Sequence, residues 1–420
     1  MQTNLAPEFK NTADGLEAEA ILRKCVHCGF CTATCPTYQL LGDELDGPRG
    51  RIYLIKQVLE GAQPTRKTQR HLDRCLSCRN CETTCPSGVE YGHLVDIGRK
   101  LVDERVPRPA IEKTVRWALK EGLPSPLFAP AMALGQAVRP LLPESLKNKV
   151  PARQPAGALP SRSHARKMLM LAGCVQPAMA PNINAATARV LDAAGIEAVM
   201  APKAGCCGAV KFHLNDQDGG KAEMRRNIDA WWPLVAGDQD ADGNRTPGVE
   251  AIVMNASGCG VTVKEYGHIL RNEPAYADKA ARISALTRDI SELLPNLVEQ
   301  LKGKVTAKAG QNAGQIAFHP PCTLQHGQQL RGGVEQHLSA LGFQIKVASC
   351  EAHLCCGSAG TYSVLQPEIA YQLRDRKLGN LSDMKPAVIA SANIGCITHL
   401  QSGTATPVRH WVELLDEALA

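Results

Sequence analysis

Short apolar stretches without polar interruption recur along the chain from residue 166 onward. The first three are KMLMLAGC, IEAVMA and AIVMNASGC, and the next three are QIAFHPPC, FQIKVAS and AVIASANIGC. Strands that are apolar at nearly every position are typical of parallel sheets covered on both faces. Two helical patterns between them, RVLDAAG and QHLSALG, close on Gly195 and Gly342, as helix C-termini commonly do. The pattern therefore predicts α/β domains with parallel sheets.

These stretches form two copies of one unit, which we assign to residues 166–300 and 301–420. Each copy has a strand ending in cysteine, a helix, a second strand, a Cys-Cys-Gly turn, a further helix and a third strand ending in cysteine. The first cysteine precedes the turn by 32 positions (174 to 206) in one copy and by 33 (322 to 355) in the other. Ligands of open α/β sheets lie at the carboxyl ends of strands, so we expect the cysteines of both copies to face one crevice. These candidate metal or redox residues are Cys174, Cys206, Cys207 and Cys259 in the first copy and Cys322, Cys355, Cys356 and Cys396 in the second.

The first 100 residues contain two further cysteine runs, CVHCGFCTATCP and CLSCRNCETTCP. Both follow C-x2-C-x2-C-x3-C-P, the spacing of bacterial two-cluster ferredoxins, in which the fourth cysteine of each run binds the other cluster. Zinc is the alternative, but structural zinc sites use four ligands, often in paired CxxC knuckles, which eight cysteines in two triple-spaced runs fit poorly. We therefore predict a ferredoxin-type domain of the α+β class over residues 1–100. One [4Fe-4S] cluster is expected on Cys25, Cys28, Cys31 and Cys85, and the other on Cys75, Cys78, Cys81 and Cys35.

The segment between the two runs contains GPRGRIYLIKQVLEG, which reads as a turn followed by a helix. Arg49 and Arg51 stand at the start of this helix. They either offset the negative charge of the clustered thiolates or are surface charges of a helix start, and the sequence leaves both interpretations open.

Composition narrows the class of protein. The chain has 420 residues, 44% of them apolar and 17 of them cysteine, which is long enough for several domains that need no disulfide staples. The start MQTNLAPEFKNTADGLEAEA lacks the apolar core of a signal peptide, and no stretch reaches the roughly 18 to 20 apolar residues of a membrane helix. We therefore expect a cytoplasmic protein with reduced thiols.

The net charge of +6 is concentrated between residues 105 and 162, where ten Lys and Arg face three Glu among ten prolines. We interpret residues 101–165 as a Pro-rich basic linker that is solvated. A docking strip for an acidic partner or for anionic lipid is the alternative. Nucleic-acid binding is disfavoured because no aromatic-interleaved basic patch or known module is present.

Together, these motifs resemble a known family across essentially the whole chain. The ferredoxin runs, GPRGRIYLIK, AGCCGA, HLCCGSAGTYS, MNASGCG and SANIGC are similar to those of the iron-sulfur subunits of membrane-associated 2-hydroxyacid dehydrogenases, glycolate oxidase (glycolate dehydrogenase) in particular. The resemblance implies an electron-transfer subunit of an oxidoreductase complex in which separate FAD-containing glycolate dehydrogenase subunits oxidise glycolate to glyoxylate. It implies that electrons leave for a quinone or another acceptor, and that the complex contacts the inner face of the cytoplasmic membrane peripherally.

The chain departs from the fuller Cys-Cys-Gly motif, whose last element is CxxC. The first of those two positions holds Ala256 in one copy and Asn393 in the other, leaving four cysteines per copy. One further iron-sulfur centre, one shared between the copies, or no metal all stay open. Buried free cysteines, as we interpret Cys350, are the alternative to a site.

Two rival functions follow from the same motifs. The resemblance extends to the third subunit of anaerobic glycerol-3-phosphate dehydrogenase and to heterodisulfide reductases. One alternative is therefore a subunit of a complex that oxidises glycerol-3-phosphate or lactate. The other is a catalytic subunit that reduces disulfides. The chain has no GxGxxG after a strand and no Walker A run, so a flavin is expected on another chain.

Four histidines follow or precede cysteines and are candidates for proton relay or quinone binding: His213, His319, His353 and His399. Such histidines are more often hydrogen-bonded neighbours of a site than its ligands.

Overall fold

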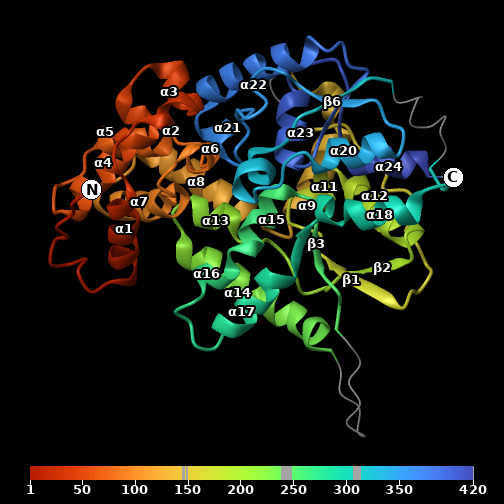
Figure 1. The fold of residues 1–420 in the computed structure, drawn as a ribbon, viewed down its shortest axis with the longest axis horizontal. Coiled ribbons are helices and arrows are strands. Elements are labelled where there is room, and N and C mark those ends of the chain that lie inside the picture. Colours follow the sequence, from red (N-terminus) through yellow and green to blue (C-terminus); the bar gives the residue numbers. More distant parts are fainter. Residues whose placement is uncertain (144–146, 148–149, 238–247, 306–313, 420) are drawn as a thin grey trace, which may run out of the picture.

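The computed structural model describes residues 1–143, 147, 150–237, 248–305 and 314–419 (Figure 1). The N-terminal part lies at one end of the molecule, beside helices of the second copy, while the strands of the first copy lie towards the other end. All described strands belong to residues 166–410.

The N-terminal part is helical, which differs from the α+β class expected for it. Residues 1–143 contain helices and no strand, because the segment between the cysteine runs repeats its apolar residues at helical spacing, as at Ile52, Ile55 and Leu59. Helix packing is close: a Cβ on Gly98 would lie 2.5 Å from Ile55, so only glycine lets the two helices approach this far. The elements are α1 (Ala13–Lys24), α2 (Phe30–Ala33), α3 (Pro36–Leu41), η1 (Glu44–Asp46), α4 (Pro48–Leu59), α5 (Arg66–Asp73), α6 (Asn80–Thr84) and α7 (Tyr91–Arg105).

The described residues of the basic connector form two helices and a short turn. They are α8 (Ala110–Gly122), α9 (Phe128–Ala137) and η2 (Arg139–Leu141), and no residue of any of them is fully buried. Several large apolar side chains point to solvent instead, among them Leu127, Leu134 and Leu141. Their spacing of seven residues places them on one face of α9 and its extension.

The two copies have the same sheet topology, which confirms the predicted duplication and the parallel α/β class. One sheet has the order β2-β1-β3-β4 and the other β6-β5-β7-β8, with all neighbours parallel. The strands are β1 (Arg166–Met170), β2 (Ile196–Val199), β3 (Ile252–Met254), β4 (Thr287–Asp289), β5 (Ile316–Phe318), β6 (Ile345–Val347), β7 (Val388–Ser391) and β8 (Val408–His410).

Two details of the sheets differ from the sequence pattern. The edge strands β4 and β8 were not predicted, because three residues that include an arginine give no apolar run. The central strands also end four or five positions before their cysteines. After β5, for example, Pro320 and Pro321 cannot donate to a ladder, so the chain leaves the sheet before Cys322.

Helices cover both sheets. Those of the first copy are α11 (Gln176–Met179), α12 (Pro181–Ala193), α13 (Ala209–His213), α14 (Gln217–Ala236), α15 (Ser257–Lys264), α16 (Tyr266–Ile269), α17 (Ala277–Leu286), η3 (Ile290–Leu293) and α18 (Leu294–Leu301). Those of the second copy are η4 (Thr323–Gly327), α20 (Gly333–Ala340), α21 (Tyr362–Leu365), α22 (Pro367–Ser382), α23 (Ile394–Gln401) and α24 (Trp411–Ala418). Gly195 and Gly342 follow α12 and α20 with φ of 75° and 96°, as predicted for helix ends.

One hydrophobic core runs through both copies. It contains Val190 and Leu191 of α12 together with Trp411 and Leu415 of α24, which pack across the boundary between the copies. Arg189 of α12 also forms an ion pair with Asp416 of α24, Nη2 to Oδ2 2.6 Å. The copies are therefore expected to unfold as one unit, and their cysteine sites are held rigidly with respect to each other.

This shared core predicts the effect of truncating Leu415, which is fully buried. Leu415→Ala should lower the free energy of unfolding by about 2–5 kcal/mol and shift a single transition of both copies. Leu159→Ala, the same truncation at a side chain that is 57% exposed, should change it by less than about 0.5 kcal/mol. Denaturant unfolding followed by circular dichroism measures both, and two separate transitions in Leu415→Ala would contradict the shared core.

Candidate metal centres

The two N-terminal cysteine runs adopt the same turn. In each, the second residue after the first cysteine has a left-handed backbone, His27 at φ 58° and Ser77 at φ 51°. The residue after the second cysteine is also left-handed, Gly29 at φ 85° and Arg79 at φ 59°. Left-handed backbone costs a non-glycine residue about 1–2 kcal/mol, so its repetition in both loops indicates a ligand that stabilises the turn.

The fourth cysteine of each run lies beside the other run. Burial raises the pKa of Cys25, and the neighbouring thiolate of Cys85 raises it further. In the second run, burial raises the pKa of Cys78, and the charge of Cys35 adds to the effect. Thiols that disfavour each other's ionisation in this way need a bound cation to become thiolates together, so these two groups of four suit iron-sulfur clusters.

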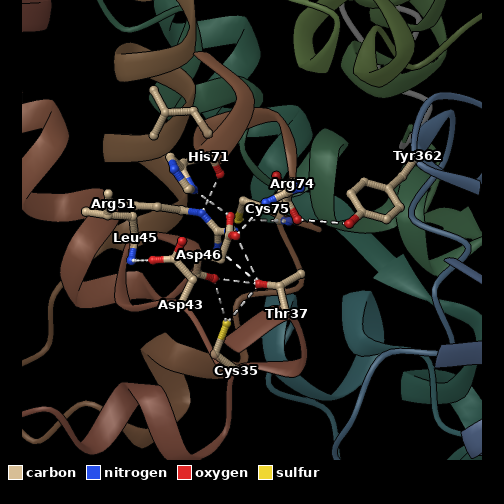
Figure 2. A network of polar contacts seen from close by, with 12 residues as sticks. Cys35, Thr37, Asp43, Leu45, Asp46, Arg51, His71, Arg74, Cys75 and Tyr362 are labelled. Atoms are coloured by element: carbon tan, nitrogen blue, oxygen red, sulfur yellow. Dashed lines mark hydrogen bonds and ion pairs between the residues drawn. The ribbon is translucent and has the colours of Figure 1, made fainter. Parts of the chain in front are cut away.

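A buried arginine lies among the thiols of the second group (Figure 2). The Arg51 side chain is 1% exposed and donates from Nε to the carbonyl of His71 at 2.7 Å and from Nη1 to Thr37 Oγ1 at 3.2 Å. Burial would raise the pKa of Cys75, but Arg51, followed by Arg99, lowers it below the usual value. Of the two interpretations left open by the sequence, the structure favours charge compensation for Arg51.

Arg49 differs from Arg51 although both start the same helix. Its side chain is partly exposed and pairs with Glu44, Nε to Oε1 2.6 Å. It also lies against the loop of the first run, because a Cβ on Gly29 would be 2.9 Å from its Nη1. Arg49 is thus a surface charge at the rim of the first group, whereas Arg51 is enclosed.

Asp46 anchors the buried arginine. Its carboxylate pairs with Arg51 at 3.4 Å, with Arg74 at 2.7 Å and with His71 at 3.0 Å, and it is fully buried. The carbonyl of Arg74 in turn accepts a hydrogen bond of 2.9 Å from Tyr362. Figure 2 shows Tyr362 reaching this network from the second copy, so the network joins the N-terminal part to the C-terminal part.

The Cys-Cys-Gly cysteines form two thiol sets with the same internal order. In the first thiol set Cys174 contacts Cys206, Cys206 contacts Cys207 and Cys207 contacts Cys259. The hydrogen bonds from Cys174 and Cys207 lower the pKa of Cys206 below its usual value. The second thiol set follows the same order of contacts: Cys322, Cys355, Cys356, Cys396.

The glycine after each cysteine pair is required by the backbone, as its sequence position suggested. Gly208 and Gly357 have φ of 93° and 89°. A Cβ would lie 2.7 Å from the carbonyl oxygen of Gly220 in the first copy and 2.4 Å from that of Ala370 in the second. The amides of both glycines point back at the first cysteine of the pair, 3.4 Å from the sulfur, which is how backbone donors stabilise a thiolate.

Both thiol sets border one cavity of about 520 Å³. Seven of the eight Cys-Cys-Gly cysteines line it, and Cys356 lies behind Cys355. Its other walls include Leu119, Leu123, Phe128 and Met132 of the connector. The crevice expected at the sheet edges is therefore present, and the connector forms part of its lining, which the sequence did not indicate.

The second thiol set also adjoins the second cysteine run. Leu76 and Cys78 pack in one cluster with Cys322 and Cys355. The pKa of Cys78, raised by burial, is raised further by the charge of Cys322, so these sulfurs are neighbours. The N-terminal part and the second copy thus meet at their cysteines.

The remaining residues singled out from the sequence occupy different places. His213 is exposed and faces Asp96 at 3.3 Å, and His353 accepts from Asn80 through its backbone carbonyl. His399 is buried and contacts the carbonyl of Ala370 at 3.1 Å. Cys350 is exposed, which contradicts its interpretation as a buried cysteine, because it follows β6 in a surface bend.

Arg99 and Tyr91 were not identified from the sequence. Arg99 donates to the carbonyl of Leu72 and to Ser77, and Tyr91 donates to the sulfur of Cys75 at 3.6 Å. Tyr91 is the first residue of α7 and Arg99 lies eight residues further along it. Their place on the helix that follows the second run was the available signal.

No helix among the described residues is both long and apolar enough to cross a bilayer.

Two family models match the chain in the regions just described. A 4Fe-4S dicluster domain matches residues 21–89, and a cysteine-rich domain matches twice, over residues 168–264 and 316–401. The first match indicates two [4Fe-4S] clusters in the N-terminal part. The second coincides with the two thiol sets.

Comparison with curated proteins extends the match to the whole chain. The chain is 54% identical to the glycolate oxidase iron-sulfur subunit of Escherichia coli K12, with 100% of this chain and 99% of that protein covered. It is 30% identical to the probable glycolate oxidase iron-sulfur subunit of Bacillus subtilis 168, covering 98% and 96%. Lactate utilization protein A of Geobacillus thermodenitrificans is 26% identical over 60% of this chain and 98% of that protein. By its full-length similarity, its dicluster domain and its two cysteine-rich domains, the chain belongs to the family of glycolate oxidase iron-sulfur subunits.

Proposed function

We propose that this protein is the electron-transfer subunit of a flavin-dependent oxidoreductase complex that converts glycolate to glyoxylate. The observation that carries the proposal is the 54% identity to a glycolate oxidase iron-sulfur subunit over the full length, which includes both cysteine-bearing regions of this chain. FAD and the oxidation of the substrate belong to partner subunits, because hydride chemistry needs a flavin while iron-sulfur clusters transfer single electrons.

The ligand assignment is part of this proposal. Cys25, Cys28, Cys31 and Cys85 would hold one [4Fe-4S] cluster, and Cys75, Cys78, Cys81 and Cys35 the other. The two thiol sets would hold a further iron-sulfur centre or redox site. The division of the chain into residues 1–100, 101–165, 166–300 and 301–420 belongs to the same proposal. The grouping of the cysteines is supported by the shared turn of the two runs and by the identical order of contacts in the two thiol sets.

Electrons would enter at the first cysteine run. Cys28 is the exposed cysteine of its group, and Val26 and Phe30 beside it are 68% and 61% exposed. An apolar rim around an exposed metal ligand suits docking of a flavoprotein, because cluster and flavin must approach closely for electron transfer. The partially exposed Arg49 adds a positive charge to this surface.

A quinone is the proposed acceptor, bound in the shared cavity. At about 520 Å³ the cavity falls within the range of small-molecule sites, roughly 300–1,000 Å³. The connector contributes apolar walls, and both thiol sets face the space. A flat apolar ring with carbonyl oxygens would therefore lie beside the cysteines that we expect to be redox-active.

The same connector supports peripheral contact with the inner face of the cytoplasmic membrane. Phe128 and Met132 of α9 face the cavity, while Leu127, Leu134 and Leu141 point to solvent. The surplus of Lys and Arg over Glu in residues 105–162 would attract anionic lipid to this side. A quinone leaving the bilayer under α9 would then meet the cavity directly.

The alternatives are less well supported. The similarity to the lactate utilization protein covers 60% of this chain, against the full length for the glycolate oxidase subunits. A catalytic disulfide-reducing role would call for the first cysteine of a CxxC, where the chain has Ala256 and Asn393.

Replacing Cys28 tests the entry of electrons. In the purified complex, Cys28→Ser should lower the iron content by about four atoms per chain and slow glycolate-dependent quinone reduction at least tenfold, because one cluster loses a ligand. Cys350→Ser, a change at an exposed cysteine outside every group, should alter neither. Unchanged quinone reduction in iron-depleted Cys28→Ser would refute the proposed route.

Replacing Arg51 tests charge compensation. Arg51→Met should make the midpoint potential of one cluster more negative by about 100 mV, because a unit charge at ~7 Å and an effective dielectric of ~20 is worth about 2 kcal/mol. Arg51→Lys keeps the charge, so its midpoint potential should stay close to that of the wild type. Arg49→Met should have a smaller effect because Arg49 is solvated. Potentiometric EPR titration measures these values, and unchanged potentials in Arg51→Met would contradict the assignment.

Replacing Leu134 tests the membrane contact. Leu134→Glu should reduce binding of the chain to vesicles that contain anionic phospholipid by about tenfold, since it removes buried apolar area and adds a repelled charge. Leu159→Glu provides the same change at an exposed leucine outside α9 and η2. Vesicle co-sedimentation compares them, and equal binding of both variants would show that α9 does not lie on the membrane.

A further inference from the structure

His319 is a buried histidine whose ring has no partner among the residues that the structure describes. Its side chain is 1% exposed, and neither Nδ1 nor Nε2 forms a hydrogen bond with any of them. An unpartnered polar atom in the protein interior costs about 1–3 kcal/mol. Buried histidines are normally hydrogen-bonded, as His399 is with the carbonyl of Ala370, so His319 calls for a ligand or another acceptor.

The backbone aims this ring at the second thiol set. His319 directly follows β5, and its amide donates to the carbonyl of Ala390 in β7 at 2.8 Å. Its own carbonyl accepts from Ser391 at 3.0 Å. A ring nitrogen of His319 and the sulfurs of Cys356 and Cys396 all lie within 4.8 Å of one another. Three soft donors at this spacing are close enough to bind one metal ion.

The first copy has no counterpart to this histidine. His319 lies three positions before Cys322. The residue three positions before Cys174 is Leu171, which is buried in an apolar cluster. The two thiol sets have the same order of sulfurs but not the same surroundings. Identical chemistry in both is therefore not expected.

Two further differences make the second thiol set more polar. Asn393 donates to the sulfur of Cys396 at 3.7 Å and accepts from the amide of Gly258, whereas the first copy has Ala256 at this position. Lys377 is buried near the second set. The residue at the same distance after the cysteine pair of the first copy is Ile228, which carries no charge. Lys377 Nζ contacts the carbonyl of Glu351, so its charge is held in place beside the thiols.

We propose that His319 is a metal ligand that acts with Cys356 and Cys396 in the second thiol set and takes the place of the missing CxxC cysteine. The first thiol set offers thiolates alone, so the two copies carry different centres. A mixed imidazole and thiolate donor set suits zinc or an iron of an iron-sulfur centre. If the metal is iron, a neutral imidazole in place of a thiolate raises the potential, which would draw electrons from the adjoining second run.

This inference rests on the proposed further centre in the Cys-Cys-Gly region. The experiment uses the full-length chain, purified and reconstituted without oxygen, and compares its metal content and spectra with those of His319→Leu, which copies the residue of the first thiol set. His337→Gln is the control, because His337 belongs to the same copy but bonds to its own helix at Gly333.

The expected result for the wild type is metal beyond the eight irons of the two clusters. If the extra metal is iron, pulsed EPR of the reduced chain should show a strongly coupled imidazole nitrogen that changes on 15N-histidine labelling. If it is zinc, X-ray absorption at the zinc edge should show nitrogen at about 2.0–2.1 Å beside sulfur at about 2.3 Å. His319→Leu should lose the nitrogen signal and bind the extra metal at least tenfold more weakly, while keeping eight irons.

His319→Cys keeps the test decisive if the leucine variant does not fold, since it should retain the metal and lose only the nitrogen signal. An extra metal without a nitrogen ligand in the wild type would overturn the inference, as would retention of the nitrogen signal in His319→Leu. Absence of any metal beyond eight irons would also overturn it. In that case the role of the two N-terminal clusters, tested separately with Cys28→Ser, would stand.

Discussion

The structure depends on compensating negative charge in a dry interior. Four thiolates in the second N-terminal group can be buried together only with positive charge beside them, and Arg51 supplies part of it. The guanidinium is itself fixed by Asp46, Thr37 and the carbonyl of His71. Because Cys35 and Cys75 come from different runs and both lie near Arg51, this one buried cation would stabilise the proposed crosswise pairing of the two runs.

That network also fixes how the N-terminal part meets the rest of the chain. Tyr362 of α21 donates to the carbonyl of Arg74, and Leu76 packs against Cys322 and Cys355. On the opposite side Arg79, from the loop of the second run, pairs with Glu265 of the first copy, Nη2 to Oε2 2.9 Å. The second run is thus held between both copies, which suits a relay between an exposed entry site and the shared cavity.

Duplication supplied two similar thiol sets, and local substitutions made them different. The cysteine order, the left-handed glycine and the sheet topology are common to both. The residues that surround the sulfurs are not: Leu171 and Ala256 offer the first set no nitrogen donor at the two positions where His319 and Asn393 place nitrogen beside the second. If both sets hold the proposed centres, this divergence would give a symmetric fold a direction, because two centres of different potential favour electron flow one way.

The sequence alone determined the features that depend on neighbours along the chain. The cysteine spacing, the helix from Pro48, the terminal glycines at Gly195 and Gly342, and the parallel class of both sheets all follow from local geometry and hydrophobic period. The α+β class expected for the N-terminal part was wrong in its secondary structure, since the two-cluster turns are supported by helices alone.

Only the tertiary structure decided which charges and ring nitrogens reach the sulfurs. Arg49 and Arg51 are two residues apart and look equivalent in the sequence, yet one is solvated and the other is enclosed, because the helix turns their side chains to different sides. His319 and His399 likewise differ only in what folds around them. Desolvation and hydrogen-bond partners come from segments far apart in the chain, so spacing could identify the thiols but not the groups that tune them.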